Sequence, residues 1–132
     1  MKLLLDTNAY SALREGDEAV VEHVRGAESL VLSAVVVGEL LYGFRHGARF
    51  EGNHRLLRGF LDLPEVEFLP VTYTTADRFG RVFAELRKKG RPIPTNDIWI
   101  AAHALESGAN LLSFDLHFAE VEGVAFVRPD QS

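Results

Sequence analysis

The sequence of 132 residues contains no cysteine, which excludes disulfide bonds and thiolate metal sites and makes an intracellular setting the simpler expectation. Long apolar runs are also missing, because no stretch approaches the ~18–20 residues that span a bilayer. The apolar start "MKLLLD" is too short for a signal peptide, and an acid interrupts it. We therefore expect a soluble cytoplasmic protein with no membrane contact.

Basic residues are in deficit, with 14 Lys and Arg against 19 Asp and Glu and a formal net charge of -5. Nucleic-acid-binding proteins are usually basic. However, a metal ion bound by several carboxylates cancels part of their charge. The charge balance therefore argues only weakly against a nucleic-acid substrate.

Repeats, low-complexity segments and Pro/Gly-rich linkers are absent, and the length predicts one domain over residues 1–132.

Short apolar runs alternate with helical patterns along the whole chain. The runs predict buried strands at 2–6, 29–33, 66–71, 109–114 and 124–128. Apolar residues with helical spacing predict helices over 34–46, 74–89 and 95–107, and weaker patterns indicate helices at 18–25 and 50–62. Ser33 and Thr95 are predicted N-caps, and Gly108 is expected to end the last long helix.

Strands that alternate with helices predict an α/β protein, with a parallel sheet covered by helices on both faces. In such sheets the functional crevice lies beyond the carboxyl ends of the strands, where the strand order reverses. The residues of interest are therefore those just after each strand and those in the first turns of the helices that follow.

Four acidic residues occupy such positions. Asp6 and Asp115 end predicted strands, Asp97 lies in the first turn of a helix, and Glu39 lies on an apolar helical segment. Taken singly, Asp6 and Asp115 could be turn or cap residues, Asp97 could complement the helix dipole, and Glu39 could reach solvent from the margin of the core. Taken together, four crowded carboxylates need a cation, and oxygen ligands favour Mg²⁺ or Mn²⁺.

Neighbouring polar residues could support these acids. Thr7 and Asn8 follow Asp6 and are either ordinary turn residues or groups that orient the acid, and Ser113 could add a hydroxyl at the same edge. The five histidines do not form a ligand set, and His46 and His117 either approach RNA or, as the simpler interpretation, are solvated loop residues. The basic run "RKKGR", with Arg87, Lys88, Lys89 and Arg91, is either a solvated helix end or a weak phosphate-contact site.

Four motifs occur in a familiar order: "LLLDTN", "VVVGELLYG", "IPTNDIWIAAHAL" and "LLSFDLHFAEVEGV". Over essentially the whole chain they resemble the PIN-domain ribonucleases, and specifically the VapC-type toxins of bacterial and archaeal toxin–antitoxin pairs. The resemblance implies a three-layer α/β/α sandwich with a five-stranded parallel sheet in the order 3-2-1-4-5. A single "DTN" would be weak support, whereas four motifs in order are specific.

The resemblance also implies a function. Asp6, Glu39, Asp97 and Asp115 match the family's acidic quartet, which binds Mg²⁺ or Mn²⁺ and hydrolyses RNA phosphodiesters to 5′-phosphate and 3′-hydroxyl ends. Asn8 and Ser113 match supporting positions, Ser113 replacing the family's frequent Thr. The implied partners are transfer or ribosomal RNA, a cognate VapB-type antitoxin, and a second copy of the chain in a homodimer. The segment 39–44 and the helix 50–62 are candidate walls for the antitoxin.

Other functions are also considered. A phosphatase or phosphoacceptor domain likewise places an Asp after its first strand, but the phosphatase would need a second Asp where this chain has Asn8. A phosphoacceptor would need a late Lys at a strand end, and the sequence has none there. A non-catalytic PIN domain and a housekeeping PIN nuclease in RNA maturation or decay remain as alternatives to the toxin.

Overall fold

The computed structural model describes residues 1–130. Its strands are β1 (Lys2–Leu5), β2 (Ser29–Ser33), β3 (Val66–Leu69), β4 (Asn110–Leu112) and β5 (Ala125–Val127). Its helices are α1 (Thr7–Glu15), α2 (Glu18–Arg25), α3 (Ala34–Arg45), α4 (Phe50–Leu61), α5 (Tyr73–Lys88) and α6 (Thr95–Ser107), with a short 3₁₀ helix, η1 (Leu116–Glu120). Each predicted strand and helix is therefore present, with small changes in its bounds.

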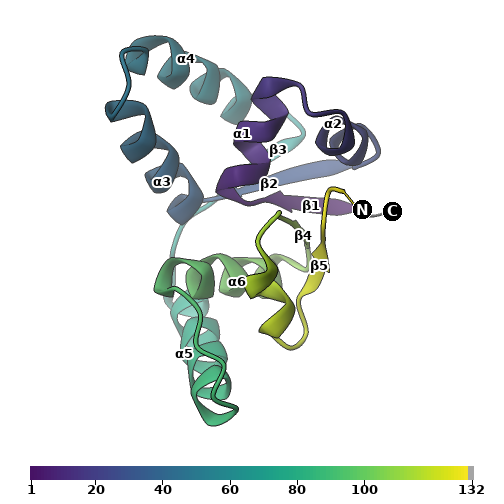
Figure 1. Cartoon of the computed structure of the whole chain (residues 1–132), viewed down its shortest axis with the longest axis vertical. Helices are drawn as coiled ribbons and strands as arrows, with labels where there is room; N and C mark the ends of the chain where they lie inside the picture. The colour runs from purple at the N-terminus through teal and green to yellow at the C-terminus, as the bar shows by residue number, and fades with distance from the viewer. Residues whose placement is uncertain (131–132) are drawn as a thin grey trace.

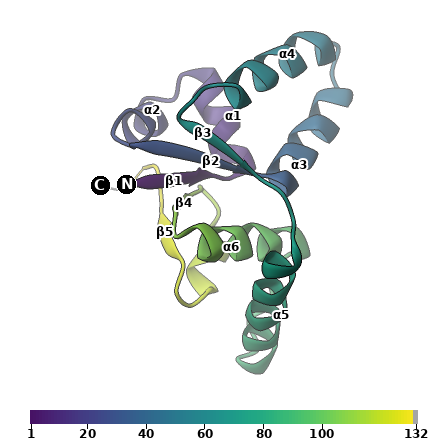
Figure 2. The ribbon, with the colours of Figure 1, turned by 180° about the vertical axis from the view of Figure 1, so that it is seen from behind.

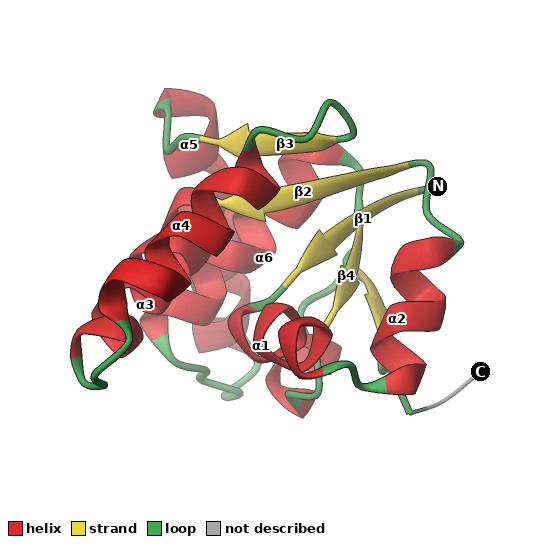
Figure 3. Ribbon diagram, turned by 90° about the horizontal axis from the view of Figure 1, so that it is seen from above, coloured by secondary structure: helices red, strands yellow, loops and turns green. Residues whose placement is uncertain are grey.

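The strands form one parallel sheet in the order β3-β2-β1-β4-β5, as the resemblance implied (Figure 3). Strand β1 is central, because Leu4 pairs with Val31 on one side and with Leu111 on the other. Leu3, Leu4 and Leu5 are fully buried. A strand buried on both faces explains the uninterrupted leucines at the start of the chain.

The helices form layers on both sides of this sheet. Helices α1, α2 and the α3–α4 pair lie on one side, and α5, α6 and η1 lie on the other (Figures 1 and 2). The predicted three-layer α/β/α arrangement is confirmed. Within the described part of the chain, the helices are too short or too polar to cross a membrane.

Two local predictions were wrong or incomplete. No helix was predicted over residues 7–15, of which only Thr7 and Asn8 were interpreted as possible turn residues, but these residues form helix α1, which Gly16 ends at a φ of 81°. The short apolar face made by buried Ala9 and Tyr10 and half-buried Leu13 was the missed signal. Thr95 is not the N-cap of α6, because the helix begins at Thr95 itself and Pro94 occupies the cap position. The predicted caps Ser33 and Gly108 are both confirmed.

Candidate active site

Asp6 is held at the junction of β1 and α1, beside the end of β4. Its backbone N–H donates to the carbonyl of Leu112 over 3.0 Å, which extends the β1–β4 pairing by one residue. Asp6 is the N-cap residue of α1, but its side chain does not cap the helix. Instead its Oδ2 accepts a hydrogen bond of 2.7 Å from the hydroxyl of Ser113. Burial raises the pKa of Asp6 to about 6, although the bond from Ser113 opposes the rise.

Hydrogen bonds made by two of the predicted supporting residues connect the segment after β4 to the region around Asp6. The hydroxyl of Ser113 donates to Asp6 and accepts from the backbone N–H of Asp115 over 2.9 Å. The side-chain oxygen of Asn8 accepts from the backbone N–H of Phe114 over 3.3 Å. Ser113 and Asn8 therefore set the relative positions of Asp6 and Asp115 at the point where the strand order reverses.

Glu39 reaches the same edge from helix α3, and both of its carboxylate oxygens are engaged. Thr7 donates its hydroxyl to Oε1 over 2.5 Å, and Asn96 donates its side-chain N–H to Oε2 over 3.2 Å. Thr7 was a predicted supporting residue of Asp6; its hydroxyl contacts Glu39, while a hydrogen bond from its backbone lowers the pKa of Asp6. Asn96 was not predicted, although its position directly before Asp97 at the start of a helix was an available signal.

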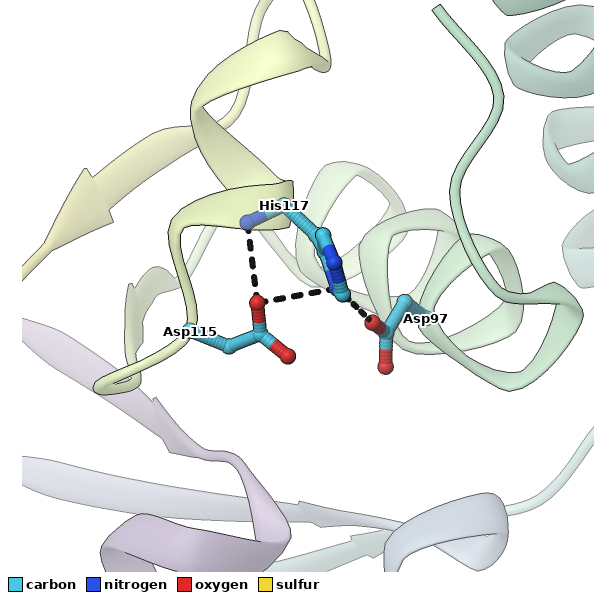
Figure 4. A group of neighbouring side chains, drawn as sticks. All are labelled: Asp97, Asp115 and His117. Carbon is cyan, nitrogen blue, oxygen red and sulfur yellow. Dashed lines mark hydrogen bonds and ion pairs between the residues drawn. The ribbon is translucent and has the colours of Figure 1, made fainter.

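Asp97 and Asp115 approach each other across the imidazole of His117 (Figure 4). Nδ1 of His117 lies 3.0 Å from Oδ2 of Asp97 and 2.9 Å from Oδ1 of Asp115. Asp115 also caps η1, because its Oδ1 accepts from the backbone N–H of His117 over 3.0 Å. His117 is exposed, as expected, but it lies in η1 and not in a loop, and its ring contacts two acids. Its place two residues after a candidate acid, in a turn which that acid caps, was the missed signal.

Charge and burial act together on these groups. Burial raises the pKa of Asp97, and the hydrogen bond with His117 opposes this rise. The pKa of His117 is raised, chiefly by its hydrogen bond to Asp97. Repulsion from Asp97 and Glu39 also raises the pKa of Asp6, and repulsion from Asp115 and Glu39 raises that of Asp97. The four predicted acids therefore lie close enough to repel one another.

These residues fit a divalent cation. Ligand atoms of Asp97, Asp115 and His117 all lie within 4.8 Å of one another, and Asp6 and Glu39 lie outside this compact group. Carboxylates that repel one another in a partly buried site are stabilised by a positive ion, and their oxygens are the donors that Mg²⁺ and Mn²⁺ prefer. Asp6, Glu39, Asp97 and Asp115 would supply the oxygens, and His117 would add a nitrogen.

The predicted basic residues lie at the end of helix α5 and in the segment that follows it. Arg87 and Lys88 end helix α5. Lys89 donates to the carbonyl of Glu120, and Arg91 lies 3.9 Å from the Glu120 carboxylate. A groove of about 370 Å³ runs between residues 90–93 and Leu116, His117 and Glu120, so that His117 borders both the groove and the acids.

Comparison with known proteins agrees with this architecture. The PIN domain family model matches residues 3–124. Ribonuclease VapC2 of Haemophilus influenzae is 35% identical over 133 residues, covering 98% of this chain and 97% of the relative. The tRNA(fMet)-specific endonuclease VapC of Salmonella typhimurium is 28% identical, covering 94% of this chain and 95% of that protein.

Solved structures give the same result. DNA-bound VapBC from Salmonella typhimurium matches with a TM-score of 0.85 and 26% identity, covering 98% of both chains. VapBC-1 from nontypeable Haemophilus influenzae matches with a TM-score of 0.85 and 25% identity, covering 99% of this chain and 100% of that one.

The fold and the acidic edge thus define a PIN-type α/β protein. The chain belongs to the PIN-domain family and, within it, to the VapC ribonucleases.

Proposed function

We propose that this chain is a divalent-metal-dependent endoribonuclease that acts in the cytoplasm as the toxin of a toxin–antitoxin pair. The observation that carries this proposal is the convergence of Asp6, Glu39, Asp97 and Asp115 at the carboxyl edge of the sheet. These four acids come from the end of β1, from α3, from α6 and from the residue before η1. A purely structural role does not explain why a fold would gather four mutually repelling carboxylates.

The polar neighbours hold each carboxylate in place, which is what a metal-dependent hydrolase requires. Ser113 orients Asp6, Thr7 and Asn96 hold Glu39, and the turn of η1 holds Asp115. A bound Mg²⁺ or Mn²⁺ would polarise the phosphoryl group, favour deprotonation of water and offset charge on the leaving oxygen. Cleavage of this type leaves 5′-phosphate and 3′-hydroxyl ends, because the ribose hydroxyl is not the nucleophile.

Two grooves beside the acids provide a path for single-stranded RNA. One is the groove along residues 90–93, where Arg91 can contact phosphate. The other, of about 490 Å³, is lined by Val35, Gly38, Glu39, Tyr42 and Asn96. Tyr42 is 67% exposed, and an exposed aromatic ring is a suitable surface for stacking of an unpaired base. We propose that the RNA crosses the acids between these grooves, and that its class is transfer or ribosomal RNA.

We further propose a VapB-type antitoxin as the protein partner, which the names of the VapBC neighbours support. A groove of about 420 Å³ separates α1 from the end of α3 and from α4. Its lining includes Phe44 and Leu56, with Arg14 and Arg49 at its sides. An amphipathic segment would bury apolar residues there and pair acids with the arginines. Homodimerisation stays a prediction, to be checked by light scattering in solution.

The proposed activity is tested by RNA cleavage with Mg²⁺ or Mn²⁺. We expect Asp6→Asn and Asp97→Asn each to lower the cleavage rate by at least roughly 100-fold, since even outer partners of metal ligands typically contribute 10–100-fold. Asp77→Asn is the matched control, because Asp77 lies on α5 and pairs with Arg81 at 3.1 Å. Cleavage of both active-site variants at the unsubstituted rate would show that the acids are not the catalytic groups.

The toxin role has its own test. Expression of the unsubstituted chain should arrest growth, and co-expression of the antitoxin encoded beside it should restore growth. The Asp97→Asn variant should not arrest growth. If RNA is cleaved but growth continues, the chain is a housekeeping nuclease. If neither occurs while RNA still binds, it is a non-catalytic PIN domain.

A further inference from the structure

His117 stands apart from the acids in its chemistry, although it is part of the same cluster. A single atom, Nδ1, contacts carboxylate oxygens of both Asp97 and Asp115, at 3.0 Å and 2.9 Å (Figure 4). These two acids come from different elements, α6 and the residue before η1. The imidazole therefore lies where a ligand shared by both carboxylates would lie.

The position of His117 is set by its backbone and by its neighbours. Its N–H donates to Oδ1 of Asp115, the same oxygen that its ring contacts. The next residue, Phe118, is fully buried and anchors η1 to the core. Two residues further along, the carbonyl of Glu120 accepts a hydrogen bond from Lys89. The side chain of His117 itself is 47% exposed, so its ring is held at the rim of the site and is open to an arriving ion.

A comparison with His103 shows that this arrangement is unlike that of a structural histidine. His103 is fully buried, and its two ring nitrogens contact the hydroxyl of Ser33 and the carbonyl of Pro70. Those are neutral partners that fasten elements together. His117 instead directs a nitrogen at two carboxylates that already belong to the candidate metal centre.

We infer that His117 is a nitrogen ligand of the metal centre and makes it prefer Mn²⁺ over Mg²⁺, an inference that rests on the proposed metal-dependent function. Mg²⁺ takes oxygen ligands and gives up its waters reluctantly. Imidazole nitrogen binds divalent first-row transition ions, and although Mn²⁺ is the weakest binder in that order, it accepts a nitrogen ligand more readily than Mg²⁺. Ligand atoms of Asp97, Asp115 and His117 lie within 4.8 Å of one another, which suits a shared ion.

The alternative is that His117 only compensates the charge of the acids and moves away when a cation binds. The two roles predict opposite results when the imidazole is removed. If His117 is a ligand, its loss lowers the affinity for Mn²⁺ more than the affinity for Mg²⁺. If His117 is a competing cation, its loss raises the affinity for both ions and leaves the ratio of the two affinities unchanged.

The test is equilibrium binding of Mn²⁺ and of Mg²⁺ to the full metal-free chain, by titration calorimetry, for the unsubstituted protein and His117→Gln. Gln keeps a polar side chain but has no imidazole nitrogen. We expect the ratio of Mn²⁺ to Mg²⁺ affinity to fall by about tenfold in His117→Gln, which is at the low end of effects around metal sites. His54→Gln on α4 is the control and should keep the ratio.

A spectroscopic readout makes the test independent of activity. Electron spin-echo modulation of bound Mn²⁺ should show coupling to ¹⁴N in the unsubstituted chain and in His54→Gln, and should lose it in His117→Gln. An unchanged affinity ratio, or ¹⁴N coupling that persists in His117→Gln, would overturn the inference and leave the nuclease proposal standing. If the unsubstituted chain binds neither ion, the metal centre itself is wrong and the inference is wrong with it.

Discussion

The carboxyl group of Asp6 lies at the end of a fully buried strand and is itself only 4% exposed. Desolvation is the main cause of its raised pKa, and the charges of Asp97 and Glu39 add to it. The strand that delivers the acid to the sheet edge is therefore also what makes its ionised form unfavourable. Ionisation of Asp6 therefore costs free energy in the metal-free protein, and a bound cation would offset that cost.

This cost predicts how stability depends on pH in the metal-free chain. The pKa of Asp6 is about 6 in the folded state against an ordinary value of 3.8, so the folded state binds its proton more tightly. The free energy of unfolding should therefore fall as the pH rises from about 4 to about 6, by about 3 kcal/mol at about 1.4 kcal/mol per pKa unit. Asp97 and His117 also have raised pKa values and act in the same direction.

The contribution of Asp6 to this pH dependence can be measured by urea unfolding in EDTA at several pH values. The Asp6→Asn variant is compared with the unsubstituted chain at each pH. Asn resembles the protonated acid, so the stability difference between the two proteins should grow in favour of Asn as the pH rises. A difference that stays constant from pH 4 to pH 7 would show that burial does not perturb this carboxyl group.

The site residues that could be predicted from the sequence share one property: they follow strands or lie near the start of helices at the carboxyl edge of the sheet. Asp6, Asp97 and Asp115 could be placed from their position in the pattern alone. The contacts of Asn96 with Glu39 and of His117 with Asp97 could not, because they join residues that lie 57 and 20 positions apart. Local periodicity carries no information about such pairs.

Among the elements, the clearest tertiary junction is made by His103 on α6. Its Nε2 lies 3.1 Å from the Pro70 carbonyl, which can only accept, so Nε2 carries the proton. Its Nδ1 lies 2.7 Å from the hydroxyl oxygen of Ser33, which also accepts from the N–H of Val35. One imidazole thus ties α6 to the start of α3 and to the loop after β3.

We expect His103→Ala to lower the free energy of unfolding by about 2–5 kcal/mol, because it leaves a cavity and removes the partner of the buried Ser33 hydroxyl. His46→Ala is the comparison, since His46 is exposed at the end of α3 and its loss should change stability by less than about 0.5 kcal/mol. Chemical unfolding of both variants measures the effect. Equally small losses of unfolding free energy in the two variants would mean that the His103 contacts do not stabilise the fold.

Helix α1 illustrates what pattern reading misses at the scale of elements. Its apolar face is short, with Ala9 and Tyr10 buried and Ala12 and Leu13 half-buried against the core. It forms because the chain must leave β1 at Asp6 and cover the sheet, and Gly16 can adopt the left-handed conformation that ends it. Tertiary packing, more than intrinsic propensity, therefore determines this helix.

For the whole molecule, the candidate metal centre joins parts of the chain that are far apart in sequence. Asp6, Glu39, Asp97 and Asp115 belong to segments on both sides of the sheet, and they meet only in the folded state. An ion that binds this set binds the native state and not the unfolded one. Metal binding should therefore stabilise the entire fold through mass action.

At a concentration a hundredfold above its Kd, the bound ion should add about 2.7 kcal/mol, which corresponds to a rise in Tm of roughly 10 °C for a chain of this size. Thermal unfolding with MnCl₂ against NaCl of matched ionic strength measures the shift. Asp97→Asn should lose most of it, and Asp77→Asn should retain it. A rise that is the same in Asp97→Asn would mean that the ion binds elsewhere.

Local sequence patterns are sufficient for the α/β class, for the elements with clear periodicity and for the positions of the four acids along the chain. Those features depend on short-range spacing and on the rule that parallel strands present their carboxyl ends at one edge. Which groups meet depends on the folded chain: Ser113 contacts Asp6, Asn96 contacts Glu39, and His117 contacts two acids. Such contacts depend on side-chain directions across packed elements, and these arise only when the core is closed.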